Sequence, residues 1–191
     1  MRSLFLAASS LFIASAASAG TVTVSPAGPI PTIQGGLDAA VPGDTVVVLE
    51  GTYNGDFTNA KSSLVIRGVG SVVVNGDGLF AGAKRCVFQN FTVNGTTTAL
   101  HLDANSHGNV LSSLSVSSSG GGGVGVWIQG SRNTLLNFTA SASDTAVRVG
   151  GAFNTVMNGL AGPTSNDDAF AVTGEQHNAN VAAARAAGLL D

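Results

Sequence analysis

Three aspartates stand at the starts of two short apolar segments near the end of the chain. Asp144 lies in SASDTAVRV, and Asp167 and Asp168 lie in SNDDAFAV. When Ala146 is aligned with Ala169, Asp144 falls level with Asp167. Neighbouring carboxylates repel, so one can stay protonated as an acid while another acts as a base, or they can share a cation such as Ca²⁺. The candidate catalytic residues and Ca²⁺ ligands are therefore Asp144, Asp167 and Asp168, and the alternative is that these aspartates serve only the turn before each strand.

A second set of side chains recurs in the segments ALHLD, GVWIQG and AVRVGG. His101, Trp127 and Arg148 occupy one position of these segments, and Asp103 and Gln129 lie two positions later. Residues two apart in a strand share a face. An indole ring binds the apolar face of a sugar, and polar neighbours bind hydroxyls or a carboxylate. These residues predict a carbohydrate-binding face, and the alternative is an aromatic cluster that packs on a turn or loop.

Arg148 belongs to both candidate sites, because it also follows Asp144 by four residues. A polysaccharide lyase needs a base beside its cation, and Arg148 and Arg132 are the candidates near the acids. The high pKa of a guanidinium makes arginine an unusual base. Arg148 is accordingly a candidate catalytic residue as well as a candidate binding residue.

Both sets depend on a repeat that brings distant residues together. Asparagines recur at 109, 133, 154 and 178, so the steps are 24, 21 and 24 residues. Units this short, with no room for a helix, cannot bury a core alone and must stack as a solenoid. In a parallel β-helix each strand lies about 4.8 Å from its counterpart one coil away. The repeat therefore predicts a parallel β-helix.

Residues at equal positions of successive coils form ladders, and stacked amides can bond to one another and to the bent backbone at a corner. We expect an inward ladder with Cys86 as a buried spacer at its start. Four residues further along each unit, a second polar column is expected on the inside as well. The ladder residues are Asn109, Asn133, Asn154 and Asn178, with Asn90, Asn137 and Asn158 in the second column.

The N-terminal part carries a resemblance to a known group. TIQGGLDAAVPGDTVVVLEGTY, at 32–53, reads as a short amphipathic helix, a turn and a buried strand, and LVIRGVGSVVVNGDG follows. Over roughly residues 22–178 the chain resembles the right-handed parallel β-helix, or pectin-lyase-like, superfamily. The resemblance implies that the helix covers the first coil. It leaves the activity open, because lyases, epimerases, hydrolases and non-enzymes share this segment.

A narrower resemblance concerns the aspartates. SNDDAFAVTG is similar to the Asp-Asp motif of polygalacturonases, and Asp144 occupies the place of their preceding aspartate. The resemblance implies inverting hydrolysis, in which one carboxyl group protonates the leaving oxygen and the others activate water. The later Gly-His-Gly and Arg-Ile-Lys motifs of that family are absent from this sequence.

The predicted architecture is all-β, with one domain. Residues 1–19 predict a secretory signal peptide, because an apolar stretch follows Arg2 and ends in Ala17-Ser18-Ala19. Residues 20–178 predict a right-handed parallel β-helix of about five to six coils with a short N-terminal capping helix. The Ala-rich residues 179–191 predict a C-terminal helical cap or tail. The protein is therefore expected to be secreted, to the cell exterior or the periplasm.

Net charge and hydropathy limit the classes of molecule that the protein is expected to bind. Eight basic and eleven acidic residues give a net charge of −3, which does not favour nucleic acid. No stretch after the signal peptide is apolar for the length that spans a bilayer. The partners that stay open are an acidic polysaccharide and other copies of the chain, through the coil ends.

Three functions remain open from the sequence. About six coils with short turns favour a secreted protein that interacts with polysaccharide without catalysis, because related enzymes usually carry more coils and longer loops. The second is a small hydrolase or lyase of acidic glycans that uses the aspartates, with Ca²⁺ as the one cofactor to consider. The third is a structural module for surface assembly.

Overall fold

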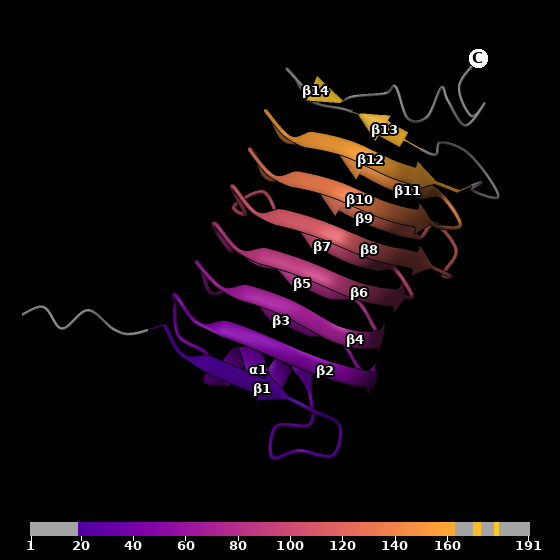
Figure 1. Ribbon diagram of the computed structural model, residues 1–191. Coiled ribbons are helices and arrows are strands. Elements are labelled where there is room, and N and C mark those ends of the chain that lie inside the picture. The colour runs from indigo at the N-terminus through magenta and orange to yellow at the C-terminus, as the bar shows by residue number, and fades with distance from the viewer. Residues whose placement is uncertain (1–18, 163–169, 173–177, 180–191) are drawn as a thin grey trace, which may run out of the picture.

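The computed structural model describes residues 19–162, 170–172 and 178–179. Asp167, Asp168, residues 1–18 of the predicted signal peptide and residues 180–191 of the predicted C-terminal cap lie outside this part of the chain. The described residues form an all-β solenoid of about six turns (Figure 1). The predicted parallel β-helix of five to six coils is confirmed.

Six coils each contribute one long and one short strand, β1 and β14 extend the sheet of long strands at its two ends, and all pairings are parallel. The long strands form an eight-stranded sheet, here the long sheet, which consists of β1 (Thr21–Val24), β2 (Thr45–Asn54), β4 (Val65–Asn75), β6 (Val87–Gly95), β8 (Val110–Ser118), β10 (Thr134–Ser141), β12 (Thr155–Ala161) and β14 (Asn178–Ala179). The short strands form the six-stranded short sheet, which consists of β3 (Phe57–Asn59), β5 (Gly78–Phe80), β7 (Thr98–Leu102), β9 (Val124–Ile128), β11 (Thr145–Val149) and β13 (Phe170–Val172).

The core fills the space between the two sheets. Phe88 of the long sheet stacks on Phe57 of the short sheet with ring centroids 5.7 Å apart, and it meets Phe80 edge-on at 5.6 Å. Leu111 and Leu135 continue the column of Phe88 on the next coils and are fully buried. Because each coil buries only a few side chains, the core becomes continuous only through stacking.

Among the described residues one short helix, α1 (Ile33–Ala39), is present, and it covers the first coil, as predicted. Its Ile33 and Leu37 side chains are buried in the core, and the Thr32 hydroxyl caps its first turn by accepting the Gly35 N–H at 3.1 Å. The helix covers the end of the solenoid, where backbone N–H and C=O groups of the first strands would otherwise be open to pairing with another chain. Within the described residues, no helix has the length and apolar character needed to cross a lipid bilayer.

Lys61 holds the other end of α1. Its Nζ donates to the carbonyls of Leu37, Asp38 and Ala40 at 2.7, 2.7 and 2.6 Å. The last carbonyls of a helix lack partners within the helix and carry partial negative charge, so a lysine is favourable there. Lys61 comes from the loop after β3 and thereby ties the helix to the second coil.

Buried asparagines stack at the corner that precedes the long strands, as the repeat predicts. The side-chain Oδ1 of each accepts the backbone N–H of the residue one coil earlier. Cys86 N–H donates to Asn109 at 2.9 Å, Asn109 N–H donates to Asn133 at 3.0 Å, and Asn133 N–H donates to Asn154 at 2.8 Å. Cys86 is 1% exposed and begins the ladder as a spacer. We call Asn109, Asn133 and Asn154 the inner ladder.

The inner ladder also satisfies the carbonyls of the neighbouring turn. The Nδ2 groups of Asn109, Asn133 and Asn154 donate to the carbonyls of residues 83, 106 and 130 at 2.9, 3.0 and 2.8 Å. Both ends of each amide are therefore used, and the three side chains are 0%, 0% and 1% exposed. A buried polar group is tolerated only when it is bonded in this way.

The second asparagine column lies on the outside, which corrects the inward position expected for it. Asn90, Asn137 and Asn158 are exposed and have left-handed φ values of 63°, 51° and 51°. A left-handed residue turns the strand and interrupts the alternation of faces. Phe88 and Phe91, three residues apart, consequently both point into the core, and the asparagine between them points out.

Asn178 is also placed differently from the prediction. Its backbone in β14 is level with Thr155 of β12, one residue beyond Asn154. The prediction aligned Asn178 with Asn154 by residue type, whereas the strand pairing offsets the two by one residue. Asn178 is therefore not level with the inner ladder.

Replacing an inner ladder residue should destabilise the protein far more than replacing an outer asparagine. Asn133→Ala leaves the Asn109 N–H and the Ser106 carbonyl buried without partners, and we expect a loss of about 3 kcal/mol in the free energy of unfolding. Asn137→Gly keeps the left-handed backbone and removes an exposed amide, so the change should stay within about 0.5 kcal/mol. Urea unfolding of both variants measures the difference, and equal losses would contradict the assignment of inner and outer columns.

Candidate functional site

The short sheet aligns the predicted carbohydrate-binding residues on its outer face. The register places His101 of β7 level with Trp127 of β9, and Trp127 level with Arg148 of β11. The His101 and Trp127 rings stack with centroids 4.7 Å apart and planes 11° apart. The Arg148 Cζ lies 5.6 Å from the Trp127 ring centroid. The three side chains thus form one continuous stack.

This stack covers the faces of the indole ring. Trp127 lies between the coils of His101 and Arg148, so one ring face contacts the imidazole and the other contacts the guanidinium. A sugar would have to bind a free ring face to use the aromatic platform. Gln129 lies two residues after Trp127 on β9. Its side-chain Oε1 is 2.8 Å from His101 Nε2, so it links β9 to the imidazole of the stack. The three side chains of the stack are each half-buried.

Asp103, the other predicted binding residue, holds a turn. Its Oδ1 accepts the Gly82 N–H at 3.0 Å, the Asn105 N–H at 3.1 Å and the Ser106 hydroxyl at 2.7 Å. Burial raises the pKa of the Asp103 carboxyl, but the hydrogen bonds from Gly82, Ser106 and Asn105, together with nearby His101, outweigh burial and hold the pKa below its ordinary value. The carboxylate therefore acts first as a structural acceptor between coils.

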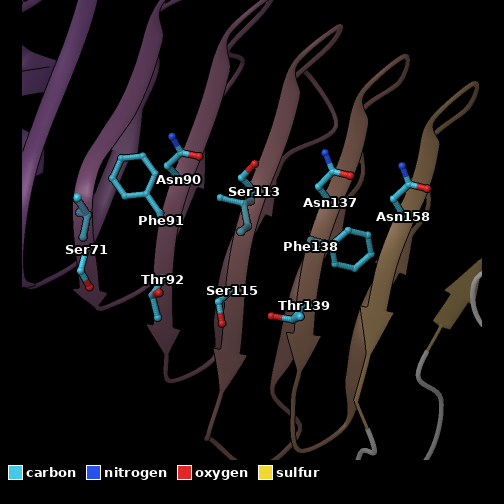
Figure 2. Close-up of a pocket in the computed structure, with 13 residues that line it drawn as sticks. Ser71, Asn90, Phe91, Thr92, Ser113, Ser115, Asn137, Phe138, Thr139 and Asn158 are labelled. Carbon is cyan, nitrogen blue, oxygen red and sulfur yellow. The ribbon is translucent and has the colours of Figure 1, made fainter. Parts of the chain in front are cut away.

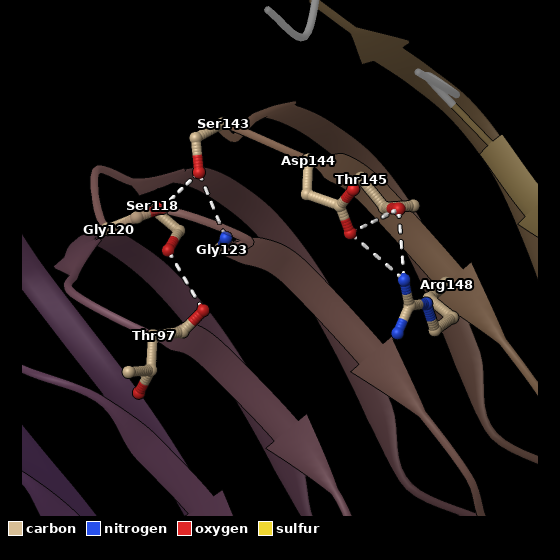
Figure 3. Close-up of polar contacts among 8 residues, drawn as sticks. All are labelled: Thr97, Ser118, Gly120, Gly123, Ser143, Asp144, Thr145 and Arg148. Carbon is tan, nitrogen blue, oxygen red and sulfur yellow. Dashed lines mark hydrogen bonds and ion pairs between the residues drawn. The ribbon is translucent and has the colours of Figure 1, made fainter. Parts of the chain in front are cut away.

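Asp144 is engaged by an arginine. Its Oδ2 lies 3.1 Å from the Arg148 Nη2, and the same nitrogen donates to the Thr145 hydroxyl at 3.3 Å (Figure 3). The Asp144 and Arg148 side chains are 29% and 34% exposed. This is the single ion pair within residues 19–162, 170–172 and 178–179. Asp144 therefore has a cationic partner that balances its charge.

The rest of the predicted acid cluster falls on Asp167 and Asp168, outside the described residues. The backbone register sets Val147 level with Phe170, the same alignment that placed Asp144 beside Asp167 in the sequence. Among the residues that the structure describes, no three His, Cys, Asp or Glu side chains gather into a metal-binding group. The Ca²⁺ site and the acid–base site remain predictions.

A groove runs across the outer face of the long sheet, at the corner made by the left-handed residues. It has a volume of about 640 Å³ and crosses five coils. One side carries the exposed polar residues Asn90, Ser113, Asn137 and Asn158. The floor and far side consist of Val72, Phe91, Leu114 and Phe138, then Thr92, Ser115 and Thr139. We call this feature the long-sheet groove (Figure 2).

The groove carries a regular row of exposed polar groups, of which Asn90 Nδ2 donates to the Gly68 carbonyl at 3.5 Å. In Figure 2 the amides of Asn90, Asn137 and Asn158 point in the same direction along the row. Within the described part of the chain, the Asn137 and Asn158 amides bond to no protein group, in contrast to the buried ladder. Adjacent members of the row lie one coil apart, or about 4.8 Å. None of the described residues that line the groove carries a charge.

Sequence reasoning missed this groove because it assigned its asparagines to the interior. The signal was present in the four-residue offset from the inner ladder, since Asn is the residue that most readily adopts a left-handed backbone after glycine. A second surface ladder was also missed. Asn75 Nδ2 donates to Asn54 at 3.0 Å, Asn94 Nδ2 donates to Asn75 at 3.2 Å, and Ser117 donates to Asn94 at 2.9 Å.

Comparison of the chain with protein-family models, with curated proteins and with solved structures gave no match.

Stability below neutral pH should depend on Asp103. Its folded-state pKa lies below the unfolded value of about 3.9. The carboxylate therefore stabilises the fold fully above that value, and the stabilisation is lost as the pH falls through the lowered folded-state pKa. Asp103→Asn should be less stable at pH 7 and should lose less stability between pH 5 and pH 2 than the parent. Thermal unfolding across this range measures both, and parallel pH profiles would refute the role of Asp103.

Proposed function

We propose that this protein is a non-catalytic polysaccharide-binding solenoid whose long-sheet groove holds an extended, uncharged glycan chain. The observation that carries the proposal is the row of exposed amides and hydroxyls that recurs on successive coils beside an apolar floor. Sugar hydroxyls both donate and accept hydrogen bonds, as do amides and hydroxyls of the protein. A polymer with repeating hydroxyl groups suits a surface with repeating partners.

The shape of the groove supports a linear ligand. Five coils span four steps of about 4.8 Å, or about 19 Å along the solenoid axis. The floor residues Phe91, Leu114 and Phe138 are only 3%, 4% and 3% exposed, so the floor is a closely packed apolar surface with little area open to solvent. The polar rows on either side of it would supply the contacts that orient a sugar chain. A chain that lies along the axis meets the same groups at every coil.

The uncharged lining, as far as the described residues form it, supports a neutral glycan at this groove. An acidic chain would lose part of its hydration there without gaining a cationic partner. The stack of His101, Trp127 and Arg148 supports sugar binding less well, because both indole faces are covered and Arg148 is paired with Asp144. Export of the chain, which residues 1–19 predict, would bring the groove to glycans outside the cell.

Binding should depend on the outer asparagines. With neutral soluble polysaccharides such as xylan, galactomannan and β-glucan as probes, we expect the full chain to be retarded in affinity electrophoresis. The double variant Asn137→Gly/Asn158→Gly keeps the backbone conformation and removes two amides, each worth about 1 kcal/mol, so the dissociation constant should rise roughly 30-fold. Asn105→Gly, at an exposed turn outside the groove, should bind as the parent does.

Two results would overturn the proposal. The first is the failure of every neutral polysaccharide to bind, or unchanged binding by the double variant, since either removes the role of the groove. The second is the release of reducing ends or unsaturated products from the bound polymer, because turnover would make the protein an enzyme. Circular dichroism of each variant distinguishes lost binding from lost fold.

A further inference from the structure

A column of left-handed residues precedes the inner ladder, and two of its members are arginines. Ser63, Arg85, Gly108, Arg132 and Phe153 have φ values of 59°, 56°, 67°, 58° and 57°. Their backbones follow one another from coil to coil, since the Gly108 N–H donates to the carbonyl of residue 131 and the Arg85 N–H to that of residue 107. Lys84 precedes Arg85 and is also exposed. We call Lys84, Arg85 and Arg132 the basic edge.

The arginines occupy a conformation that disfavours them. A residue with a Cβ atom loses free energy in the left-handed region, and glycine does not. Gly108 occupies the same position of the intervening coil, which demonstrates that the turn forms without a side chain. A Cβ built on Gly108 would meet only Arg85 Cγ, at 3.8 Å. The turn therefore forms with glycine at this position, and strain of this kind at Arg85 and Arg132 points to a role for their side chains.

The basic edge also carries uncompensated charge. Lys84, Arg85 and Arg132 are exposed, and within the described residues none of them lies in an ion pair. Arg132 is positioned by Phe153, whose ring centroid lies 5.6 Å from its Cζ. The chain as a whole carries a net charge of −3. Three free cations on one edge of an acidic protein form a local site for anions.

The spacing of the edge suits an extended polyanion. Arg85 and Arg132 are two coils apart, which separates their backbones by about 10 Å along the solenoid axis. Guanidinium groups bind carboxylates through paired hydrogen bonds, and Lys84 adds a mobile charge beside them. Nucleic acid carries one charge per roughly 1.7 Å and requires a broader basic face.

We propose that the basic edge binds a linear, carboxylate-bearing polysaccharide that lies along the solenoid axis, with Arg85 and Arg132 pairing its carboxylates. This site lies at a different corner from the long-sheet groove and takes a different polymer. The protein would then hold a neutral and an acidic glycan on neighbouring corners of the same coils.

Polygalacturonate of defined length, titrated at low salt and at physiological salt, tests the proposal with the full chain. Arg85→Gly and Arg132→Gly should each weaken binding about tenfold and reduce its dependence on salt, because each removes one charge-assisted contact. Arg85→Gly should unfold at the same temperature as the parent or at a higher one, because it relieves a left-handed side chain. Gly108→Arg should tighten binding and lower the unfolding temperature.

The control is Arg67→Gln, which removes the same charge from an exposed position on β4. If Arg67→Gln weakened polygalacturonate binding as much as the glycine variants do, the effect would come from net charge alone and the proposal would be overturned. Unchanged binding by both glycine variants would also overturn it. Duplex DNA that binds as tightly as polygalacturonate at the same salt would also overturn it. Binding of neutral glycans at the long-sheet groove is measured separately, so either proposal can fail without the other.

Discussion

The hydrogen bonds of the inner ladder are the constraint on which the other features depend. Each coil of this chain is too small to bury a core, and the one cysteine, which is buried, provides no disulfide. The amides of Asn109, Asn133 and Asn154 join the N–H of one coil to the carbonyl of the turn beside it. A shift by one residue would leave several buried polar groups without partners, so the ladder sets both the position of each corner and the register of the strands that follow.

Because the register between coils is fixed, residues that recur at the same position of each coil form continuous rows on the surface. Because side chains at equal positions lie one coil apart, a polar residue that recurs becomes a line of identical groups, as at the long-sheet groove. The same rule stacks His101, Trp127 and Arg148 so closely that they contact one another. The solenoid therefore favours ligands that are themselves repetitive. Left-handed residues turn side chains outward at its corners, and the corners differ in the charge of these side chains.

Much of this arrangement is predictable from the sequence, and the errors have physical causes. The recurrence of Asn109, Asn133 and Asn154 predicts the coil, and strand alternation correctly aligns His101 with Trp127 and Arg148. Alternation fails at Asn90, Asn137 and Asn158 because a left-handed φ inverts the face, and no pattern of residue types states φ directly. Alignment by residue type also misplaces Asn178, because the strand pairing sets it level with Thr155 and residue types alone do not fix the register. The spacing of residues along the sequence likewise does not reveal that His101 and Arg148 cover the two faces of the Trp127 ring.

Disulfide trapping between outer positions of adjacent coils measures the register most directly. The Cα atoms of Ser115 and Thr139 are level on β8 and β10, about 4.8 Å apart, which is within disulfide range. Ser115 and Ser141 are offset by two residues, or about 8 Å, which is beyond it. The pair Ser115→Cys/Thr139→Cys should oxidise rapidly and completely, whereas Ser115→Cys/Ser141→Cys should stay reduced under the same conditions. Preferential oxidation of the offset pair would show that the coils are not held in the register that the inner ladder requires.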